Sequence, residues 1–263
     1  MGEYTFHILG CRGSRPMSGA CYQQFGGATS CYLLRSDRHA VVLDCGTGLY
    51  NAGQYLHGCR HIDVLLTHLH YDHILGLLNW SVFPPDADVR FYISGETAES
   101  LKISEFIKKP FWPVSPDLGK ITFVDYSSTL QLTEDISARF FPANHPDNAS
   151  LIRVDTENGA VCLVGDWEHG TAFPEDMLKG CSLLIYDGMF TEAEYSSHRG
   201  WGHSTWQEGV RLAVEMKISN LIITHHLPER TDEELLDMET EASQGFPGIR
   251  FAREGDVYTL HKE

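Results

Sequence analysis

Short hydrophobic runs that end in polar or glycine-containing turns dominate the first quarter of the chain. Their length predicts β-strands, because helices in globular proteins are usually longer. These strands are expected at residues 4–9, 31–34, 40–43 and 62–67. The spacing of apolar residues predicts helices over residues 49–56 and 73–80. This part of the chain therefore mixes strands with short helices.

The rest of the chain adds further strands and two capped helices. The strands are expected at residues 121–124, 136–141, 150–154, 160–164, 183–186, 221–224 and 257–260. Glu157-Asn158-Gly159 joins two of these runs, which indicates an antiparallel hairpin. Residues 205–217 are amphipathic and open with the capping-box pattern Thr205-x-x-Glu208. A last helix opens with Thr231-x-x-Glu234.

No repeat, low-complexity segment or linker divides the 263 residues, so one α/β (α+β) domain over residues 1–263 is expected. Hydrophobic content of 42% and charged content of 21% are ordinary for a globular protein. No run approaches the roughly 18 apolar residues of a membrane span, and no basic leader precedes the first strand. We expect a cytoplasmic protein without membrane contact. The seven cysteines include no C-x-x-C pair and predict buried thiols rather than a disulfide framework.

The strand at residues 62–67 ends in the most informative motif of the chain. Four potential metal ligands follow it within six residues: His68, His70, Asp72 and His73. Imidazole and carboxylate groups suit zinc, iron, manganese or nickel, and the absence of thiolate argues against a closed structural zinc site. A lone His-x-His would be typical of a surface loop, but this denser cluster predicts a metal site.

Three more candidate ligands stand at the ends of later strands. His145 follows residues 136–141, Asp166 follows 160–164, and His225 follows 221–224. His226 competes with His225, because neighbouring strand residues point to opposite faces and only one of them can reach a given site.

Three loops carry residues that could assist such a site. Arg12 and Ser14 lie in a glycine- and proline-containing turn whose N–H groups could face a ligand, although a simple loop is the alternative. Asp44 precedes a glycine-containing turn, where it could form an Asx-turn or support a metal ligand. Residues 108–113 mix bases with aromatics; a packed surface loop is the favoured interpretation and a lid the alternative.

The motif of residues 67–73 resembles the signature of the metallo-β-lactamase superfamily of dinuclear hydrolases. Other stretches resemble its phosphodiesterase branch, which includes tRNA 3′-processing endonucleases and phosphoribosyl cyclic phosphodiesterases. These stretches are residues 10–16, 26–31, 44–48 and 202–205. The resemblance implies a four-layer αββα sandwich that binds two divalent transition-metal ions. Zn²⁺ is the expected metal, with Mn²⁺ or Fe²⁺ as alternatives.

The resemblance also implies how the ligands divide. His68, His70 and His145 are expected at one metal, and Asp72, His73 and His225 at the other, with Asp166 bridging. The superfamily pattern selects His225 and leaves His226 in reserve.

Two departures from the processing endonucleases concern the substrate and the proton donor. Only twenty residues separate His145 from Asp166, which leaves no room for the tRNA-gripping arm inserted there in those enzymes. Their His-Glu-Ala-Thr motif is replaced by Asp187-Gly188-Met189-Phe190. His203, in a glycine-flanked turn before helix 205–217, is our candidate general acid. Asp187 is the next candidate, and a capping role for His203 is the structural alternative.

Together these features predict a metal-dependent phosphodiesterase for a small cyclic or nucleotide-like diester. A metal-bridging hydroxide, oriented by Asp72, would attack phosphorus, with donors near Arg12 assisting. The alternatives are a thioester or lactone hydrolase and, less favoured, a non-catalytic metal-binding protein. A net charge of −16 predicts no extended nucleic-acid binding. Two divalent ions would add a charge of about +4 locally and favour a small anion. A homodimer is left open.

Overall fold

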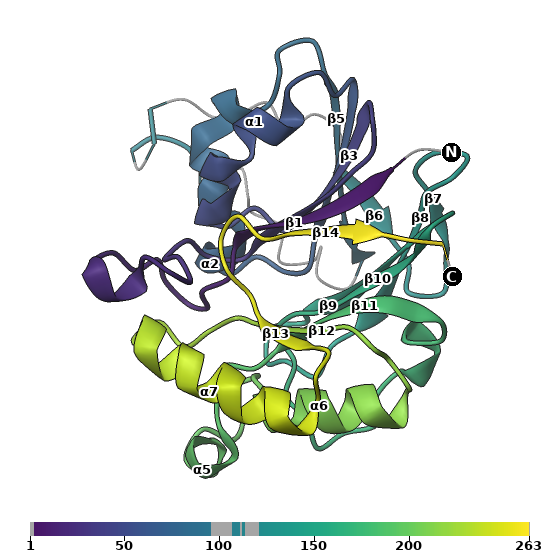
Figure 1. Ribbon diagram of the computed structural model, residues 1–263. Coiled ribbons are helices and arrows are strands. Elements are labelled where there is room, and N and C mark those ends of the chain that lie inside the picture. Colours follow the sequence, from purple (N-terminus) through teal and green to yellow (C-terminus); the bar gives the residue numbers. More distant parts are fainter. Residues whose placement is uncertain (1–2, 96–106, 111, 114–120, 263) are drawn as a thin grey trace.

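The computed structural model describes residues 3–95, 107–110, 112–113 and 121–262. Its frame consists of two seven-stranded sheets that stack face to face (Figure 1). The strand order is β14-β1-β2-β3-β4-β5-β6 in the first sheet and β13-β12-β11-β10-β9-β8-β7 in the second. Each half of the chain builds one sheet, except that β14 returns to the edge of the first.

The first sheet begins antiparallel and continues parallel. Its strands are β1 (Tyr4–Gly10), β2 (Cys31–Arg35), β3 (His39–Leu43), β4 (His61–Leu66), β5 (Asp88–Ser94), β6 (Ile121–Val124) and β14 (Val257–Leu260). β3 to β6 run parallel, so their carboxyl ends share one edge of the sheet. β5, which follows Pro84 and Pro85, was not predicted from the sequence.

The second sheet mixes both kinds of pairing. Its strands are β7 (Leu130–Gln131), β8 (Ser137–Pro142), β9 (Ser150–Thr156), β10 (Gly159–Val164), β11 (Cys181–Asp187), β12 (Leu221–Thr224) and β13 (Ile249–Phe251). β9 and β10 form the expected antiparallel hairpin, with Thr156 opposite Gly159. β10 to β13 run parallel. β7 and β13, with two and three residues, were too short to give a hydrophobic signal and were not predicted.

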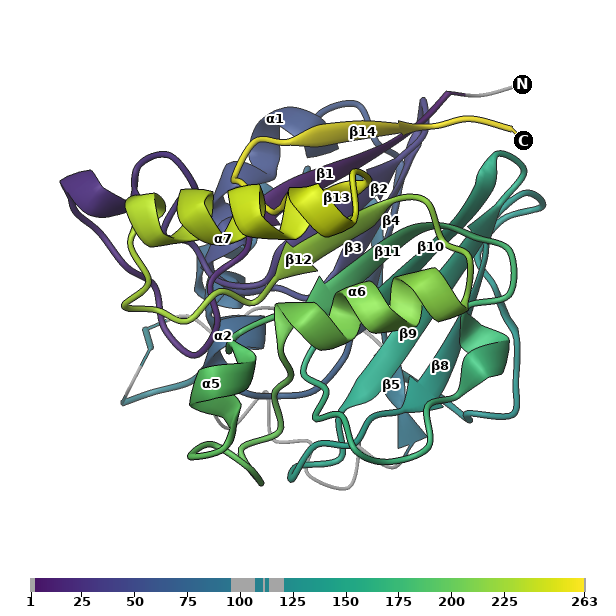
Figure 2. The same ribbon diagram turned by 60° about the horizontal axis from the view of Figure 1, so that its bottom comes forward.

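Helices cover the outer face of each sheet (Figures 1 and 2). Over the first sheet lie the 3-10 segments Thr47–Asn51 and Leu75–Val82, α1 (Gly53–Leu56) and α2 (Tyr71–Ile74). Over the second lie α6 (Trp206–Glu215) and α7 (Asp232–Gly245), and α5 (Glu192–Tyr195) stands beside them. Two further 3-10 turns cover Ala20–Tyr22 and Glu175–Met177. The predicted four-layer αββα sandwich is confirmed.

Strand alternation fills three hydrophobic layers. Leu34 and Val41 face the space between the sheets, while their neighbours Leu33 and Val42 face the outer helices of the first sheet. The third layer lies between the second sheet and α6 and α7. All seven cysteines are free thiols and six are buried, so no disulfide supports this core.

Of the two capping boxes predicted from the sequence, one is complete in the structure. Thr231 and Glu234 form a complete capping box at α7, whereas at α6 only the Thr205 side chain accepts from the Glu208 amide. The helices predicted at residues 49–56 and 73–80 break into shorter 3-10 and α segments. No helix in the described part of the chain is long and apolar enough to cross a membrane.

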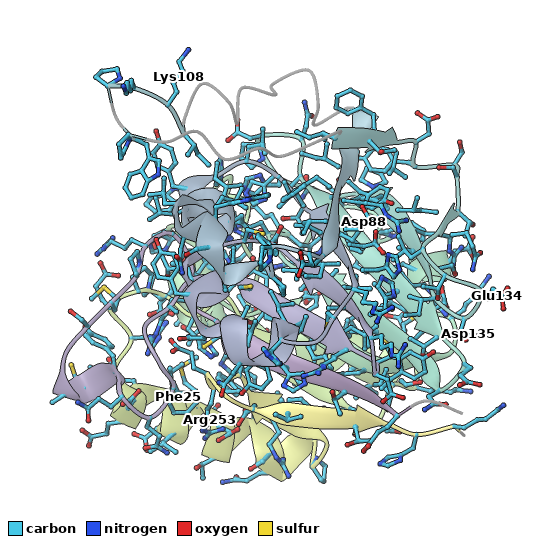
Figure 3. All side chains as sticks on the ribbon, turned by 90° about the horizontal axis from the view of Figure 1, so that it is seen from above. Phe25, Asp88, Lys108, Glu134, Asp135 and Arg253 are labelled. Carbon is cyan, nitrogen blue, oxygen red and sulfur yellow. The ribbon has the colours of Figure 1, made fainter. Side chains whose placement is uncertain are left out.

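The end of the second sheet is tied to the first loop of the chain. The Arg253 guanidinium lies 4.1 Å from the centre of the Phe25 ring, and the two side chains lie side by side in Figure 3. This cation–π contact adds to the backbone bond that Glu254 N donates to Phe25 O at 3.1 Å. The connection fixes the loop that carries Arg12 and Ser14 against the second sheet.

Candidate metal centre

Ligand-type side chains from both sheets meet at the edge where their strands end. His68 and His70 follow the carboxyl end of β4, and the first turn of α2 adds Asp72 and His73. From the second sheet, the loops after β8, β10 and β12 bring His145, Asp166 and His225 to the same place. The structure therefore brings together all seven side chains that the sequence suggested.

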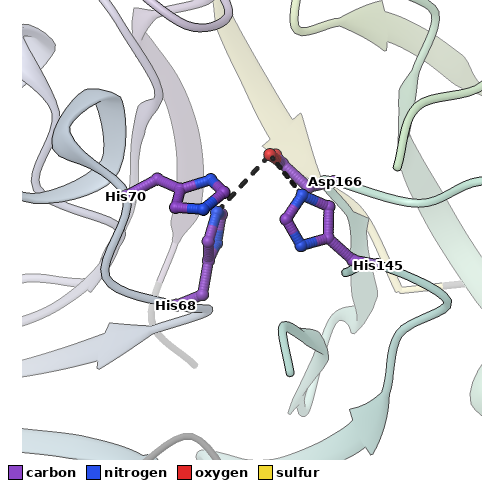
Figure 4. A group of neighbouring side chains, drawn as sticks. All are labelled: His68, His70, His145 and Asp166. Carbon is purple, nitrogen blue, oxygen red and sulfur yellow. Dashed lines mark ion pairs between the residues drawn. The ribbon is translucent and has the colours of Figure 1, made fainter. Parts of the chain in front are cut away.

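The first group consists of His68, His70, His145 and Asp166, whose ligand atoms lie within 4.8 Å of one another. Asp166 Oδ2 is 3.5 Å from His68 Nε2 and 3.7 Å from His145 Nε2. Dashed lines mark these ion pairs in Figure 4. His70 points into the same space but also lies 2.9 Å from Asp147 Oδ2. A cation at this position would be faced by three imidazoles and one carboxylate.

The second group consists of Asp72, His73 and His225. His73 Nε2 lies 3.3 Å from Asp72 Oδ2 and 3.2 Å from Asp166 Oδ1. His225 contributes Nε2, 3.7 Å from Asp72 Oδ2. The two oxygens of Asp166 are thus divided between the groups, which is the arrangement expected of a bridging carboxylate.

The unpaired polar atoms in these groups fit a cation. Within the described part of the chain, four buried atoms here have no hydrogen-bond partner: His68 Nε2, His73 Nε2, His225 Nε2 and Asp166 Oδ1. Leaving buried polar atoms unsatisfied is costly, so such atoms usually have a partner. A divalent cation among nitrogen and oxygen donors would satisfy all four together.

Asp44 orients two of the imidazoles from behind. Its carboxylate accepts from the Thr67 amide and hydroxyl at 2.8 Å and lies 2.8 Å from His73 Nδ1. The Thr67 hydroxyl lies 3.0 Å from His68 Nδ1. With each Nδ1 occupied, the Nε2 atoms face the site, an arrangement common around metal-ligating histidines. Asp44 therefore does more than close its own turn.

Burial and charge set the protonation of the cluster. Burial lowers the pKa of His68 well below its ordinary value and that of His145 to about 4, so both imidazoles are neutral at neutral pH and have a lone pair for a metal. Burial alone would raise the pKa of Asp166, but the facing histidines, His225 and His73 foremost, lower it well below its ordinary value. The carboxylate is therefore ionised.

A pocket of about 320 Å³ opens above the two groups. It is lined by Ser14, His70, Tyr71, Asp72, His145, Asp166, Trp201, His203 and His225. His203 Nδ1 lies 2.9 Å from Asp187 Oδ2, which leaves Nε2 for the pocket. Burial alone would lower the pKa of His203, but the carboxylate of Asp187 outweighs it and raises the pKa to about 9. Asp187 itself is fully buried and accepts from the amides of Trp167 and Met189, so it lies behind His203 rather than in the pocket.

Ser14 and Arg12, both predicted to contact substrate, have different surroundings. Ser14 lines the pocket, and its amide donates to Asp72 Oδ2 at 2.8 Å. Arg12 is fully buried outside the pocket lining, and its guanidinium donates to the carbonyls of Gly26, Leu227 and Arg230. This position of Arg12 argues against substrate contact, because its donors join the loop between β1 and β2 to the loop between β12 and α7.

His226 points away from the metal groups. Its Nε2 lies 2.9 Å from the Ala252 carbonyl, and its ring stacks on Phe251. His225 follows the end of β12 with a φ of +57°, so the opposite orientations of His225 and His226 arise at a turn rather than from strand alternation. His226 neither replaces His225 nor supports a ligand side chain directly.

Sequence reasoning missed three residues around the pocket: Tyr71, Trp201 and Glu168. Tyr71 and Trp201 line it, and Glu168 accepts from the amides on both sides of Trp201. Adjacency to the motifs at His70 and His203 was the only sequence signal. In the loop predicted over residues 108–113, Trp112 packs on the outer core of the first sheet, as expected of a packed loop, whereas Phe111 lies outside the described residues.

A family model described as the β-lactamase superfamily domain matches residues 39–226, which is more than half of the chain. The chain belongs to the β-lactamase superfamily. The matched segment includes all seven side chains of the two metal-ligand groups.

Relatives of this superfamily member include ribonucleases. Ribonuclease Z of Bradyrhizobium sp. is 30% identical, in an alignment that covers 87% of this chain and 92% of that protein. Mitochondrial ribonuclease Z 2 of Schizosaccharomyces pombe is 28% identical over 258 residues, with 89% of this chain covered. The chain spans only 35% of the length of the S. pombe protein.

Solved structures show the same fold. The metallo-β-lactamase fold protein YhfI from Bacillus subtilis aligns with a TM-score of 0.76 at 20% identity, over 98% of this chain and 100% of that protein. A diphosphatase of the PhnP family gives 0.70 at 20% identity over 98% of both chains. The short form of human tRNase Z gives 0.67 at 19% identity, over 97% of this chain and 99% of its own.

These comparisons correct one prediction from the sequence. The expectation that the chain excludes extended nucleic-acid binding is wrong, because relatives over most of its length are ribonucleases. The physical error lies in the use of net charge, which sums over the whole surface. Contact with a polyanion depends on the local potential around the site, to which bound cations contribute.

Proposed function

We propose that the chain is a metal-dependent phosphodiesterase. The observation that supports this proposal most strongly is the division of the two Asp166 oxygens between two ligand groups. His203, which is held by Asp187, lines the pocket above them. Two adjacent cation positions suit in-line displacement at phosphorus, where charge develops on both the entering and the leaving oxygen. The ribonuclease Z relatives support the same chemistry.

The ligand assignment follows the two groups. His68, His70 and His145 would hold one divalent metal, Asp72, His73 and His225 the other, and Asp166 would bridge them. Metals bound there would supply Lewis acidity and lower the pKa of water from about 15.7 toward 7. Zinc is the proposed metal. Asp72, fixed by the Ser14 amide, is placed to accept a proton from the attacking water.

His203 is proposed to protonate the leaving oxygen. Asp187 fixes its Nδ1, so that Nε2 is the atom available to a substrate in the pocket. The raised pKa of about 9 keeps this imidazole protonated at neutral pH. Cations in the neighbouring groups would lower that pKa toward neutrality, because like charges disfavour the protonated form. General acid catalysis works best in that range.

The substrate follows from the size and chemistry of the pocket. About 320 Å³ accommodates one phosphodiester with a neighbouring nucleotide-sized group. We propose a nucleotide-like phosphodiester as the substrate. Both a small cyclic diester and the end of an RNA chain contain such a group.

The test compares reaction classes and metal content. Protein purified without chelator is expected to contain close to two transition-metal ions per chain, and to hydrolyse bis(p-nitrophenyl) phosphate far faster than a panel of thioesters. His70→Ala should abolish hydrolysis while circular dichroism stays unchanged, because the large core does not depend on metal for folding. His61→Ala, which changes an exposed histidine at the start of β4, serves as the matched control. Preferential thioester hydrolysis, or full activity with one ion or none, would contradict the proposal.

A further inference from the structure

Two of the most exposed aromatic side chains lie on the walls of the metal pocket. Among the described residues, six large hydrophobic side chains are exposed, and they include Tyr71 at 65% and Trp201 at 61%. Both line the pocket together with the ligand histidines. Leaving an indole in water forgoes the favourable free energy of burial. Its position beside a metal site therefore suggests a ligand.

The backbone holds Trp201 in this exposed position. The Glu168 carboxylate accepts from the Gly200 amide at 2.7 Å through Oε1 and from the Gly202 amide at 2.9 Å through Oε2. The Tyr195 hydroxyl donates to the same carboxylate at 2.9 Å. The Glu168 amide donates to the carbonyl of Asn144, which precedes His145. The Asn144 side-chain amide donates in return to the Glu168 carbonyl.

A ring contact adds to this arrangement. The Trp201 indole and the His198 imidazole pack in a T-shaped arrangement, with ring centres 4.8 Å apart. The exposed indole therefore belongs to a segment fixed on both sides, one residue before Gly202 and two before His203. Such a side chain offers a preorganised surface, since little conformational entropy is lost when a ligand stacks on it.

We propose that Trp201, with Tyr71 on the same pocket, stacks against a nucleobase attached to the phosphodiester. This inference rests on the proposed function, because the diester group is expected over the metal groups. A planar π-system suits two separate aromatic faces in a pocket otherwise lined by histidines, carboxylates and a serine. A lipid chain would need a continuous apolar patch instead. The substrate class is therefore a nucleoside diester, either a small molecule or an RNA end.

The first test measures binding without catalysis. Adenosine 5′-monophosphate is titrated into the protein, with ribose 5-phosphate as the matched ligand that lacks a base. Adenosine 5′-monophosphate should quench tryptophan fluorescence in the wild type, and this quenching should disappear in Trp201→Phe. Equal responses of both proteins, or equal responses to both ligands, would overturn the inference.

The second test uses two diesters that differ only in the base: the methyl esters of adenosine 5′-monophosphate and of ribose 5-phosphate. Trp201→Ala should raise KM for the adenosine ester roughly 5- to 150-fold, the range measured for one stacked base, and leave KM for the ribose ester unchanged. Trp201→Phe should retain most of the preference. Phe123→Ala, which removes a 58% exposed aromatic outside the pocket, should change neither.

The outcomes separate this inference from the proposed function. Hydrolysis of both esters with equal KM, or an equal rise for both in Trp201→Ala, would refute base stacking while the phosphodiesterase proposal stands. If the metal-loaded protein hydrolyses neither ester, the proposed function fails. In that case the fluorescence titration, which needs no catalysis, still tests whether Trp201 stacks on a base.

Discussion

The segment 200–202 packs against Glu168 and His145. It allows a sharp test of how the backbone positions a candidate metal ligand. Gly200 and Gly202 flank Trp201, and both have positive φ, +83° and +86°. A Cβ at position 200 would meet no heavy atom of the described residues within 4 Å. A Cβ at position 202 would overlap the His145 ring and lie 2.7 Å from Pro146 Cδ. The two alanine variants therefore share backbone strain but differ in their effect on a candidate ligand.

The expected magnitudes follow from these surroundings. An alanine in the left-handed region costs about 1–2 kcal/mol, which is the whole expected loss for Gly200→Ala. Gly202→Ala adds the cost of overpacking, about 1–3 kcal/mol, because His145 and Pro146 must shift. The His145 imidazole then loses its orientation relative to Asp166. Disturbing the orientation of a metal ligand weakens metal binding about 10- to 100-fold.

Two measurements check the prediction. Urea unfolding of the metal-free variants gives the loss of stability, and competition with a chelating dye gives zinc affinity. Gly202→Ala should be less stable than Gly200→Ala by about 1–3 kcal/mol and should bind zinc at least about tenfold more weakly. Gly200→Ala should bind zinc like the wild type. If both variants lose the same stability and keep the same affinity, the close approach of Gly202 to His145 has no part in the site.

Three further predictions concern the proton donor, the buried arginine and the response to acid. His203→Ala should slow alkyl phosphodiesters roughly 10²–10⁴-fold and p-nitrophenyl esters much less, because nitrophenolate leaves without a proton; equal losses at unchanged metal content would exclude a general acid. Arg12→Met should lower the free energy of unfolding by about 1–3 kcal/mol for each buried carbonyl left without a donor, whereas Arg15→Met, at an exposed site, should cost no more than about 1 kcal/mol. Similar losses in urea unfolding would contradict the role given to Arg12. Burial alone would raise the pKa of Glu194, but Arg230 and the Thr191 donors lower it to about 2. The stability it contributes should therefore be present above about pH 4.5 and lost as pH falls toward 2. Glu194→Gln should remove this part of the acid dependence, and an unchanged difference between variant and wild type across that range would refute it.

The sequence by itself identified eleven of the fourteen strands and the seven ligand-type residues that the structure brings together. Both are local signals: a hydrophobic run predicts a strand, and a polar residue directly after it lies at the edge of a sheet, whatever the sheet packs against. The sequence also favoured His225 over His226, but for a reason that the structure does not bear out: His225 lies beyond β12 with a φ of +57°, so the two side chains diverge at a turn. The prediction failed for strands too short to show an alternating hydrophobic pattern, such as Ile249–Phe251. It also failed where 3-10 turns interrupt a helical pattern, as in Leu75–Val82.

Only the tertiary structure decided what surrounds the site. Arg12 lies in a turn that suggested an anion contact, yet carbonyls from residues 26, 227 and 230 surround its guanidinium. Asp187 lies behind His203, and Trp201 reaches the pocket because Glu168, more than thirty residues away, holds its backbone. Net charge misled for a related reason, since it carries no information on where charges lie. Contacts between distant segments depend on how the two sheets pack, and no local pattern in the chain encodes that packing.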